Sequence, residues 1–382
     1  MDVDMELEVL EKCIQDMQVI LDRMVAIVSP DGKVIAATNE EEVGRVYPNV
    51  AVFFASADKI AVQDETTMMK LHISGQPKFA IVIDGTDNQA HTYISLINRW
   101  LLAELEDEVH EADFNAFLKN ILLENELPGD IPLKARDFKI AYAAKRCAFL
   151  VSIDENECQN VIDILRSLYP NRQQDFILPI DQENIVVLKD LQRDQDGNFS
   201  VDLSIDEVAE TILNTLKAEL MTSFHIGVGT MIETLKDVAK SYREATLALV
   251  IGRIFSPEND IMKYEQLGLG RLIYQLSPTL CKMFLDEVFP DNSYFQLDNE
   301  TLLTIDKFFE NNLNGSETSR QLFVHRNTLV YRLDKVQKLT RLDLRKFDDA
   351  VLFKLASMVR LYLEYQERQN FGDKDDKRLM RR

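Results

Sequence analysis

The chain has 382 residues, of which 46% are hydrophobic and 28% are charged, and its formal net charge is −21 at pH 7. One hydrophobic core rarely organises this many residues, so the sequence predicts a soluble protein of several domains. The acidic N-terminus lacks the basic start and apolar centre of a signal peptide, and no apolar run approaches the roughly 20 residues of a membrane helix. We therefore expect a cytoplasmic protein that does not span a membrane.

The spacing of cysteines and histidines does not indicate a metal site. Four cysteines are scattered without a Cys-x-x-Cys pair, which is typical of reduced structural thiols. Five histidines show neither i,i+4 spacing nor a neighbouring cysteine. The sequence predicts no metal and no cofactor.

Residues 1–126 predict a small domain with a central antiparallel sheet. Apolar residues recur at helical spacing from Leu7 to Leu21. A Pro-Asp-Gly turn at 30–32 separates two apolar runs, which is a β-hairpin pattern. A further apolar strand ends at Asp84 and Gly85, and residues 93–123 then have the pattern of a long helix. This order of helix, antiparallel strands and helix predicts a PAS-like sensor domain.

The rest of the chain predicts an α/β part followed by an all-α part. The segment 127–137 holds two prolines and a glycine and predicts a linker. Residues 137–256 alternate between apolar strands and amphipathic helices, a pattern typical of an α/β sandwich. We expect a helical connector over 261–297, an all-α domain over 298–366 and a disordered tail over 367–382. The expected fold class is multidomain α+β.

Three amphipathic helices follow one another closely from Thr301 and predict a helix-turn-helix. The second helix, at about 317–323, is expected to be capped by Ser316. The third begins at Arg326, and its spacing places four apolar residues on a core-facing arc: Leu329, Val330, Leu333 and Val336. The opposite arc is polar and basic.

The distribution of charge favours nucleic acid as the partner, although the whole chain is acidic. Residues 316–346 hold eight basic and three acidic residues, so a short basic module stands in a strongly acidic chain. Small polar and basic side chains at the start of a helix suit base recognition in the major groove, and lysines and arginines further along suit phosphates. The candidate residues for binding double-stranded DNA are Arg320, His325, Arg326, Asn327, Thr328, Tyr331, Arg332, Lys335 and Lys338.

The string SETSRQLFVHRNTLVYRLDKVQKLTRLDL, residues 316–344, closely resembles the C-terminal helix-turn-helix of the sugar-diacid and purine-catabolism regulators. Every position of that family's pattern His-Arg-Asn-Thr-Leu-x-Tyr-Arg-Leu is present from His325 to Leu333. Arg341 stands where the family usually has glycine, which is expected to alter a helix C-cap. The resemblance implies a DNA-binding transcriptional regulator rather than an enzyme. Because one helix-turn-helix contacts few base pairs, we expect a homodimer or higher homo-oligomer.

The middle of the chain resembles the family's degenerate nucleotide-cyclase-like domain, a relative of domains that make cyclic dinucleotides. Activity in those domains requires a Gly-Gly-Asp/Glu-Glu-Phe hairpin. The corresponding hairpin here reads Ile-Asp-Gln-Glu-Asn at 180–184, so catalysis is not expected. Gly227 and Gly229 lack the third glycine and the lysine of phosphate loops, and they predict a strand against which another backbone packs closely.

Residues 25–48 resemble the family's sugar-diacid recognition domain, with two departures. The family commonly has histidine at the place of Tyr47, and a Gly-x-Asn-Leu-Pro-Ile strand where this chain has HISGQPKFAIVI. A dicarboxylate requires positive or hydrogen-bond-donating partners. The candidate residues for a small-molecule effector are Arg45, Tyr47, Lys70 and His72.

Two alternatives stay open at this point. One is a signalling protein that binds a nucleotide through its cyclase-like middle domain, and the missing glycine-rich hairpin speaks against it. The other is an interaction scaffold whose helix-turn-helix serves only for dimerisation. The polar, basic arc of the third helix speaks against the scaffold, because a dimer seam would be apolar.

Overall fold

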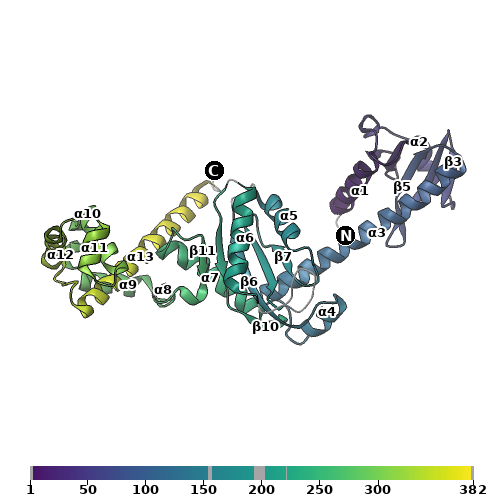
Figure 1. Cartoon of the computed structure of the whole chain (residues 1–382). Coiled ribbons are helices and arrows are strands. Elements are labelled where there is room, and N and C mark those ends of the chain that lie inside the picture. Colours follow the sequence, from purple (N-terminus) through teal and green to yellow (C-terminus); the bar gives the residue numbers. More distant parts are fainter. Residues whose placement is uncertain (1–2, 154–156, 193–202, 221, 380–382) are drawn as a thin grey trace. The chain divides into compact units, whose positions relative to one another are not determined.

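The computed structural model describes residues 3–153, 157–192, 203–220 and 222–379, and the chain divides into two compact units, Met1–Leu118 and Lys119–Arg382 (Figure 1). The first unit contains a five-stranded antiparallel sheet in the order β2-β1-β5-β4-β3. Its strands are β1 (Val25–Val28), β2 (Val34–Ala37), β3 (Ile60–Gln63), β4 (Thr66–Ile73) and β5 (Gln76–Asp84).

The predicted hairpin of β1 and β2 is confirmed, and its turn depends on glycine. Gly32 has a φ of 90°, a conformation that strains any residue with a Cβ atom. A Cβ atom there would also lie 2.5 Å from the carbonyl oxygen of Tyr47. The turn and the segment that leads into the next helix therefore pack backbone against backbone.

The two faces of this sheet have separate apolar cores because successive strand residues point to opposite sides. Ile27 and Ile81 face a core that includes Leu10 and Ile14 of α1 (Val3–Met17) and Leu101 of α3 (Asn88–Leu122). On the other face, the neighbouring residues Val28 and Val82 pack with Val50 and Phe53 of α2 (Pro48–Ala55). A short 3-10 helix, η1 (Glu40–Glu42), precedes α2.

The second unit begins with a helix where a linker was expected. Helix α4 (Ile131–Asp137) occupies most of 127–137, so that prediction is wrong for this stretch. Ile131 and Ala135 are four residues apart on one face and are both buried. Pro132 is compatible with the helix because it lies in the first turn, where no backbone N–H is needed.

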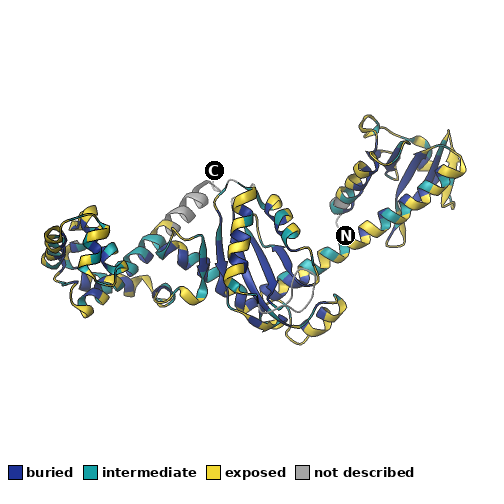
Figure 2. Cartoon of the chain, viewed as in Figure 1, coloured by how far each residue is buried: buried dark blue, intermediate teal, exposed yellow. Residues whose placement is uncertain are grey.

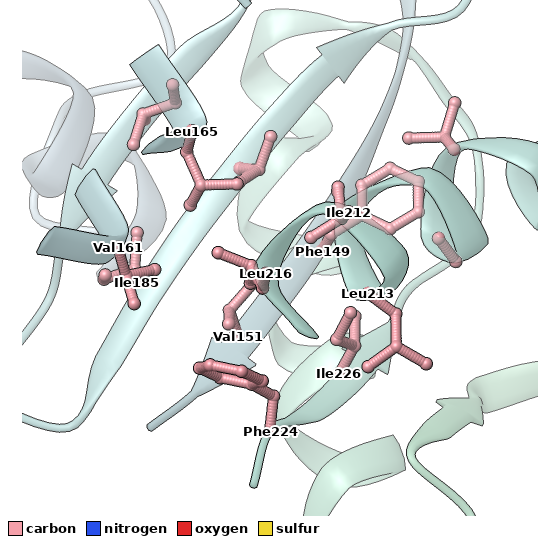
Figure 3. Packing of buried hydrophobic residues seen from close by; sticks show 14 of the residues in the cluster. Phe149, Val151, Val161, Leu165, Ile185, Ile212, Leu213, Leu216, Phe224 and Ile226 are labelled. Carbon is pink, nitrogen blue, oxygen red and sulfur yellow. The ribbon is translucent and has the colours of Figure 1, made fainter. Parts of the chain in front are cut away.

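A six-stranded sheet forms the middle of the second unit. Five of its strands follow the order β11-β9-β6-β8-β7, and the sixth, β10, also pairs with β6. Its strands are β6 (Ala143–Ser152), β7 (Phe176–Pro179), β8 (Asn184–Asp190), β9 (His225–Val228), β10 (Ile232–Thr234) and β11 (Ile261–Lys263). Helices α5 (Cys158–Leu168) and α6 (Ile205–Glu219) contribute Leu165 and Ile212 to a core with Phe149 and Val151 of β6 (Figure 3). The strands are buried, whereas the outer faces of the covering helices are exposed (Figure 2).

Helix α7 (Val238–Phe255) lies against the other side of the sheet, and two glycines allow its close approach. A Cβ atom at Gly227 would collide with the carbonyl oxygen of Ala245, and one at Gly229 with that of Ser241. The prediction that backbones pack closely at this strand is confirmed. Ser241 reinforces the contact by donating to Thr230 O at 2.7 Å and accepting from Ala148 N at 3.0 Å.

The expectation that the segment 261–297 is a helical connector is wrong at its start. It starts with β11, which pairs in parallel with β9. Only three residues long, the strand gives no recognisable period in the sequence, yet Met262 is buried against Gly252 of α7. The segment then continues through η4 (Tyr264–Gln266), α8 (Gly270–Tyr274), α9 (Pro278–Val288) and η5 (Pro290–Gln296).

The C-terminal part consists of α10 (Asn299–Glu310), α11 (Gly315–Gln321), α12 (Arg326–Thr340) and α13 (Phe347–Leu379). Its core also contains Val288, Phe289 and Leu297, all of which precede the predicted boundary at 298. Helix α13 continues to Leu379, so the prediction of a disordered tail is wrong for 367–379, and residues 380–382 lie outside the described chain.

Candidate nucleic-acid interface

Helices α11 and α12 form a helix-turn-helix in which each N-terminus is capped by a side chain. Asn314 Oδ1 accepts from the backbone N of Ser316 at 3.1 Å and of Glu317 at 3.2 Å. The prediction that Ser316 is the cap is wrong, because Asn314 has the extended backbone of a cap and Gly315 is already helical. His325 caps α12 by accepting from Asn327 N at its Nδ1, at 3.2 Å.

The cap at His325 determines which of its ring atoms can contact a ligand. Because Nδ1 accepts a hydrogen bond, the neutral ring carries its proton on Nε2. The side chain is exposed. His325 therefore both starts α12 and presents an N–H donor beside the first turn of that helix.

Helix α12 is held by three of its four predicted core residues. Leu329, Leu333 and Val336 are at most 3% exposed, whereas Val330 is 38% exposed, so the prediction for Val330 is wrong. At 100° per residue, Val330 lies 100° from Leu329 and thus at the edge of the buried arc. The core of this domain covers a narrower face of α12 than the sequence pattern indicates.

The outward face of α12 contains most of the residues that were predicted to bind DNA. Arg326, Asn327, Thr328 and Lys338 are exposed, and Tyr331 is 70% exposed. The first three occupy the first turn, where a recognition helix contacts base edges. Arg320 is also exposed, on the preceding helix α11, where its Nη2 donates to both carboxylate oxygens of Glu317 at 2.6 and 2.7 Å.

Two predicted DNA-binding residues instead join α12 to the start of α10. Arg332 donates from Nη1 to Thr304 Oγ1 at 3.0 Å and pairs with Glu300, and its side chain is only 16% exposed. Lys335 pairs with Asp298, the N-cap of α10. The hydrogen bonds from Lys335 and from the backbone of Thr301 hold the pKa of the Asp298 carboxyl well below its usual range. These pairs orient α12 and leave its first turn facing outward.

The eight basic residues of 316–346 fall into two groups of four. Arg320, Arg332, Lys335 and Arg345 each form an ion pair with a carboxylate, and Arg345 reaches Asp334 at 2.8 Å and Asp343 at 2.6 Å. The other four, Arg326, Lys338, Arg341 and Lys346, are exposed and form no ion pair with any residue that the structure describes. A phosphate can approach this second group without displacing a carboxylate.

Phe323 is a feature of the turn that the sequence analysis missed. It is 95% exposed and has a φ of 53°, in the left-handed region that favours glycine. A bulky aromatic residue here gives up burial and adopts a strained backbone, and neither cost is compensated by packing within the protein. The sequence indicates this feature only by an aromatic residue close to the turn, and the helix predicted over 317–323 includes that residue as its last.

Arg341 ends α12 in the left-handed conformation, with a φ of 66°. Its backbone N–H donates to Gln337 O at 2.9 Å. Arg341 thus adopts the geometry for which glycine is the usual residue, so the helix keeps this kind of C-cap although a residue with a Cβ atom occupies it.

The four candidate effector residues of the first unit fall into two local groups at opposite ends of α2. Near its start, Arg45 pairs with Glu42, and the Tyr47 hydroxyl donates to Glu42 Oε2 at 3.0 Å. Burial, followed by the hydrogen bond to Glu42, raises the pKa of Tyr47 to about 12. Near its end, buried Lys70 donates to the carbonyl oxygens of Phe54 at 3.3 Å and Ser56 at 2.6 Å.

His72, the other member of the group near the end of α2, is half-buried, and its Nδ1 lies 3.2 Å from Lys70 O. Lys70 also lies over the Phe53 ring, 4.9 Å from its centroid. An ammonium group at the carbonyl end of a helix neutralises the partial negative charge there. Lys70 therefore has a structural role in holding α2 on the sheet.

The hairpin between β7 and β8 contains no glycine, and its two acidic residues, Asp181 and Glu183, are not adjacent. Asp181 closes the turn by accepting from Glu183 N at 2.9 Å and from Asn184 Nδ2 at 2.9 Å. Among the described residues, no three histidine, cysteine or acidic side chains gather as a metal site would require. In the same part of the chain, no helix has the length and apolar character to cross a bilayer.

Comparison with known proteins agrees with this geometry. Residues 301–359 match the PucR C-terminal helix-turn-helix domain, and residues 124–251 match the GGDEF-like domain. The chain is 22% identical over 362 residues to the carbohydrate diacid regulator of Escherichia coli (strain K12), an alignment that covers 88% of this chain and 93% of that protein. It is 23% identical over 288 residues to the purine catabolism regulatory protein of Bacillus subtilis (strain 168), covering 71% of this chain and 52% of that protein.

A third relative is the proline-responsive transcriptional activator PutR of Bacillus subtilis (strain 168), which is 25% identical over 172 residues and matches 40% of this chain and 39% of that protein. The matched helix-turn-helix contains the outward-facing first turn of α12, and the matched GGDEF-like domain contains five strands of the six-stranded sheet, β6 to β10, but not β11. The chain is thus a DNA-binding transcriptional regulator similar to the carbohydrate diacid and purine catabolism regulators.

Proposed function

We propose that the protein controls transcription in the cytoplasm by placing α12 in the major groove of duplex DNA, in response to a signal received by residues 1–126. The observation that carries the DNA half of this proposal is the geometry of α12. Three buried residues and two ion pairs fix the helix on its domain, while Arg326, Asn327 and Thr328 face outward from its first turn. Rigid elements position contacts more precisely than loops do.

The side chains of the interface divide by role. Arg326 and Asn327 suit base recognition, because Arg can bond guanine and Asn adenine in bidentate fashion. Lys338, Arg341 and Lys346 suit phosphates, with His325, Thr328, Tyr331 and Arg320 as further contacts. Phe323, exposed at the turn, is proposed to pack against the DNA, whereas Arg332 and Lys335 are positioning residues.

The experiment is selection of retained duplexes from a random pool, followed by affinity measurements on the best sequence and on scrambled controls. Arg326→Ala should cost about 1–3 kcal/mol and relax base preference, whereas Lys338→Ala should weaken binding to all sequences alike. Lys240→Ala, an exposed lysine on α7, is the matched control. If the Arg326 and Lys338 variants bind like the control, α12 is not the helix in the groove.

The working unit is proposed to be a homodimer or higher oligomer on a repeated or palindromic site. One helix-turn-helix reads too few base pairs for useful specificity, so two half-sites are required. Sedimentation of the full chain with and without DNA tests this. A monomer under both conditions would contradict it.

Residues 1–126 are proposed to form a PAS-like input domain. A five-stranded antiparallel sheet, with helices on one face and α2 on the other, supports this assignment. Arg45 and Tyr47, which share Glu42, are the better-placed candidates for an effector, since Lys70 already bonds two carbonyl groups. Thermal stability measured with a panel of sugar diacids tests whether a small molecule binds here, and a protein signal is expected if none does.

Catalysis by the GGDEF-like domain is not part of this proposal. Its β7–β8 hairpin is closed by Asp181 and lacks the glycines of active cyclases. Incubation with GTP and Mg²⁺ should yield no cyclic dinucleotide. Formation of that product would restore the alternative of a signalling enzyme.

A further inference from the structure

The second unit contains a cleft of about 420 Å³ that both of its domains line. Ile251 and Gly252 contribute from α7, which packs on the six-stranded sheet, and Met262 contributes from β11 of that sheet. Asp306 and Phe309 of α10 and several residues of α13 contribute from the helix-turn-helix domain. This volume lies within the range of pockets that hold small organic molecules, which commonly occur where domains meet.

Helix α13 contributes buried residues to two apolar cores, that of the helix-turn-helix domain and one that it forms with α7 and α8. Phe353 and Ala356 pack in the helix-turn-helix core. Val359, Tyr362 and Leu363, one to two turns later, pack with Ile254 of α7 and Ile273 of α8. A molecule held against this helix in the cleft would touch the element that joins the DNA-binding core to the GGDEF-like domain.

Part of the cleft wall is aromatic, although the wall as a whole exposes slightly more polar than apolar surface. Phe309 lies 6.4 Å from Phe353, and Tyr294 lies 6.0 Å from Phe353, measured between ring centroids. All three residues line the cleft, together with Met262 and Leu302. This aromatic part of the wall favours the apolar body of a ligand, because removing apolar surface from water is a major source of binding free energy.

Two cationic side chains of α13 line the same cleft. Lys354 is exposed, lies over the Phe309 ring at 5.5 Å, and forms no ion pair with a described residue. Arg360 pairs with Glu364 and donates to Tyr294 Oη at 3.2 Å, but its Nε is buried and has no hydrogen-bond partner in the described structure. A buried donor without a partner is costly, and a ligand acceptor would satisfy it.

Asp306 is the acidic group that faces these cations. Burial raises the pKa of its carboxyl, and Lys354 and Arg360 act in the opposite direction. Lys263 is paired to Asp206 and Arg360 to Glu364, so Lys354 is the lining cation that has no ion pair with a described residue.

We propose that this cleft binds a small organic carboxylate with an aromatic or aliphatic body, and that the bound molecule changes DNA affinity by fixing α13 between the two domains. The carboxylate meets Lys354 and Arg360, and the body packs against Phe309 and Tyr294. This input is separate from the one proposed for residues 1–126.

The probe is 4-phenylbutyrate, with its uncharged amide as the matched control, titrated into the full chain by calorimetry or ligand-observed NMR. A ligand of this size is expected to bind with a Kd on the order of 1 mM. The amide, which lacks the charge, should bind at least roughly tenfold more weakly. No saturable binding of the carboxylate, or equal binding of carboxylate and amide, would overturn the proposal.

Two variants locate the site. Ser357→Trp fills the cleft and should abolish binding, whereas Val351→Trp, an exposed position of α13 outside the cleft, should leave it unchanged. If Ser357→Trp does not fold, Lys354→Gln at an exposed position serves instead, and it should remove the preference for carboxylate over amide. If a folded Ser357→Trp or Lys354→Gln variant binds phenylbutyrate and its amide with the same affinities as the unmodified protein, the probe binds outside the cleft.

The last measurement is DNA affinity with and without the probe. Saturating phenylbutyrate should change it by about 5- to 150-fold, the usual range of coupling between two sites. The change should disappear in Ser357→Trp, or in Lys354→Gln when the probe is added at the same concentration. Saturable binding with no change in DNA affinity would show that the cleft holds a ligand but does not act on α13.

Discussion

The salt dependence of DNA binding depends on how many cations of the basic module are free to meet phosphates. Four of the eight basic residues in 316–346 have no carboxylate partner in the described structure: Arg326, Lys338, Arg341 and Lys346. Each phosphate neutralised contributes about 0.9 to the slope of log K against log salt. Because Arg326 is assigned to base recognition, the other three should give a slope of about −2.7 for one module and about −5.4 for a dimer. If all eight residues met phosphates, a dimer would give about −14.

Two alanine variants separate these possibilities in a titration of labelled duplex by fluorescence anisotropy at several salt concentrations. Lys338→Ala should reduce the slope for a dimer by about 1.8, because each module loses one phosphate contact. Arg332→Ala should leave the slope unchanged and instead lower the free energy of unfolding by about 1–2 kcal/mol, since Thr304 and Glu300 lose their partner. A slope near −14, or an equal loss of slope in both variants, would refute the division into free and paired cations.

Three further substitutions test the backbone around the interface. Phe323 is 95% exposed and has a left-handed backbone, so Phe323→Gly should raise the free energy of unfolding by about 0.5–1 kcal/mol. The same variant should weaken DNA binding without changing the salt slope, and unchanged DNA affinity would show that Phe323 is not in the interface. Arg341→Gly should give a similar stabilisation because Arg341 also has a left-handed backbone, and it should reduce the salt slope of DNA binding by about 0.9 per module. A loss of stability in chemical denaturation would contradict this. Gly229→Ala should cost about 1–3 kcal/mol, because its Cβ atom would collide with Ser241 O, and a variant as stable as the parent in thermal unfolding would show that α7 can move away.

Local patterns in the sequence predicted the helix-turn-helix well because its helices are amphipathic and its turns carry characteristic residues. The start of α12 at Arg326 and the burial of Leu329, Leu333 and Val336 all follow from a 3.6-residue period. The turn at Gly32 was likewise predictable, since Asp-Gly between apolar runs has a conformational reason.

Tertiary partners could not be predicted in this way. Arg332 and Lys335 lie on the same surface arcs as residues that face solvent, and only the packing of α10 shows that Glu300 and Asp298 come within reach. The strand β11 was missed because three residues carry no readable period, and its burial depends on Gly252 in a helix that precedes it. The strained backbone at Phe323 is also a tertiary outcome, because the turn has to join two helices whose axes are set by the core.

The extent of the helix-turn-helix domain gives a final prediction, in which two fragments behave differently. A fragment of residues 298–366 would match the boundary expected from the sequence, but it omits Val288, Phe289 and Leu297, which are 9%, 6% and 6% exposed in the core. The Phe289 ring packs against the rings of Phe353 and Tyr294, with centroids 5.3 and 5.2 Å away.

Each of these buried side chains contributes about 1.5–3 kcal/mol, so their loss removes roughly 5–9 kcal/mol from a domain whose total stability is on the order of 5–15 kcal/mol. The fragment 298–366 should therefore lack a cooperative thermal transition. A fragment of residues 268–366, which retains α8, α9 and η5, should unfold cooperatively and bind DNA without any response to an effector of residues 1–126. Cooperative unfolding of the shorter fragment would show that α10 to α13 form a sufficient core by themselves, and that the segment before 298 packs on the domain without being required for its fold.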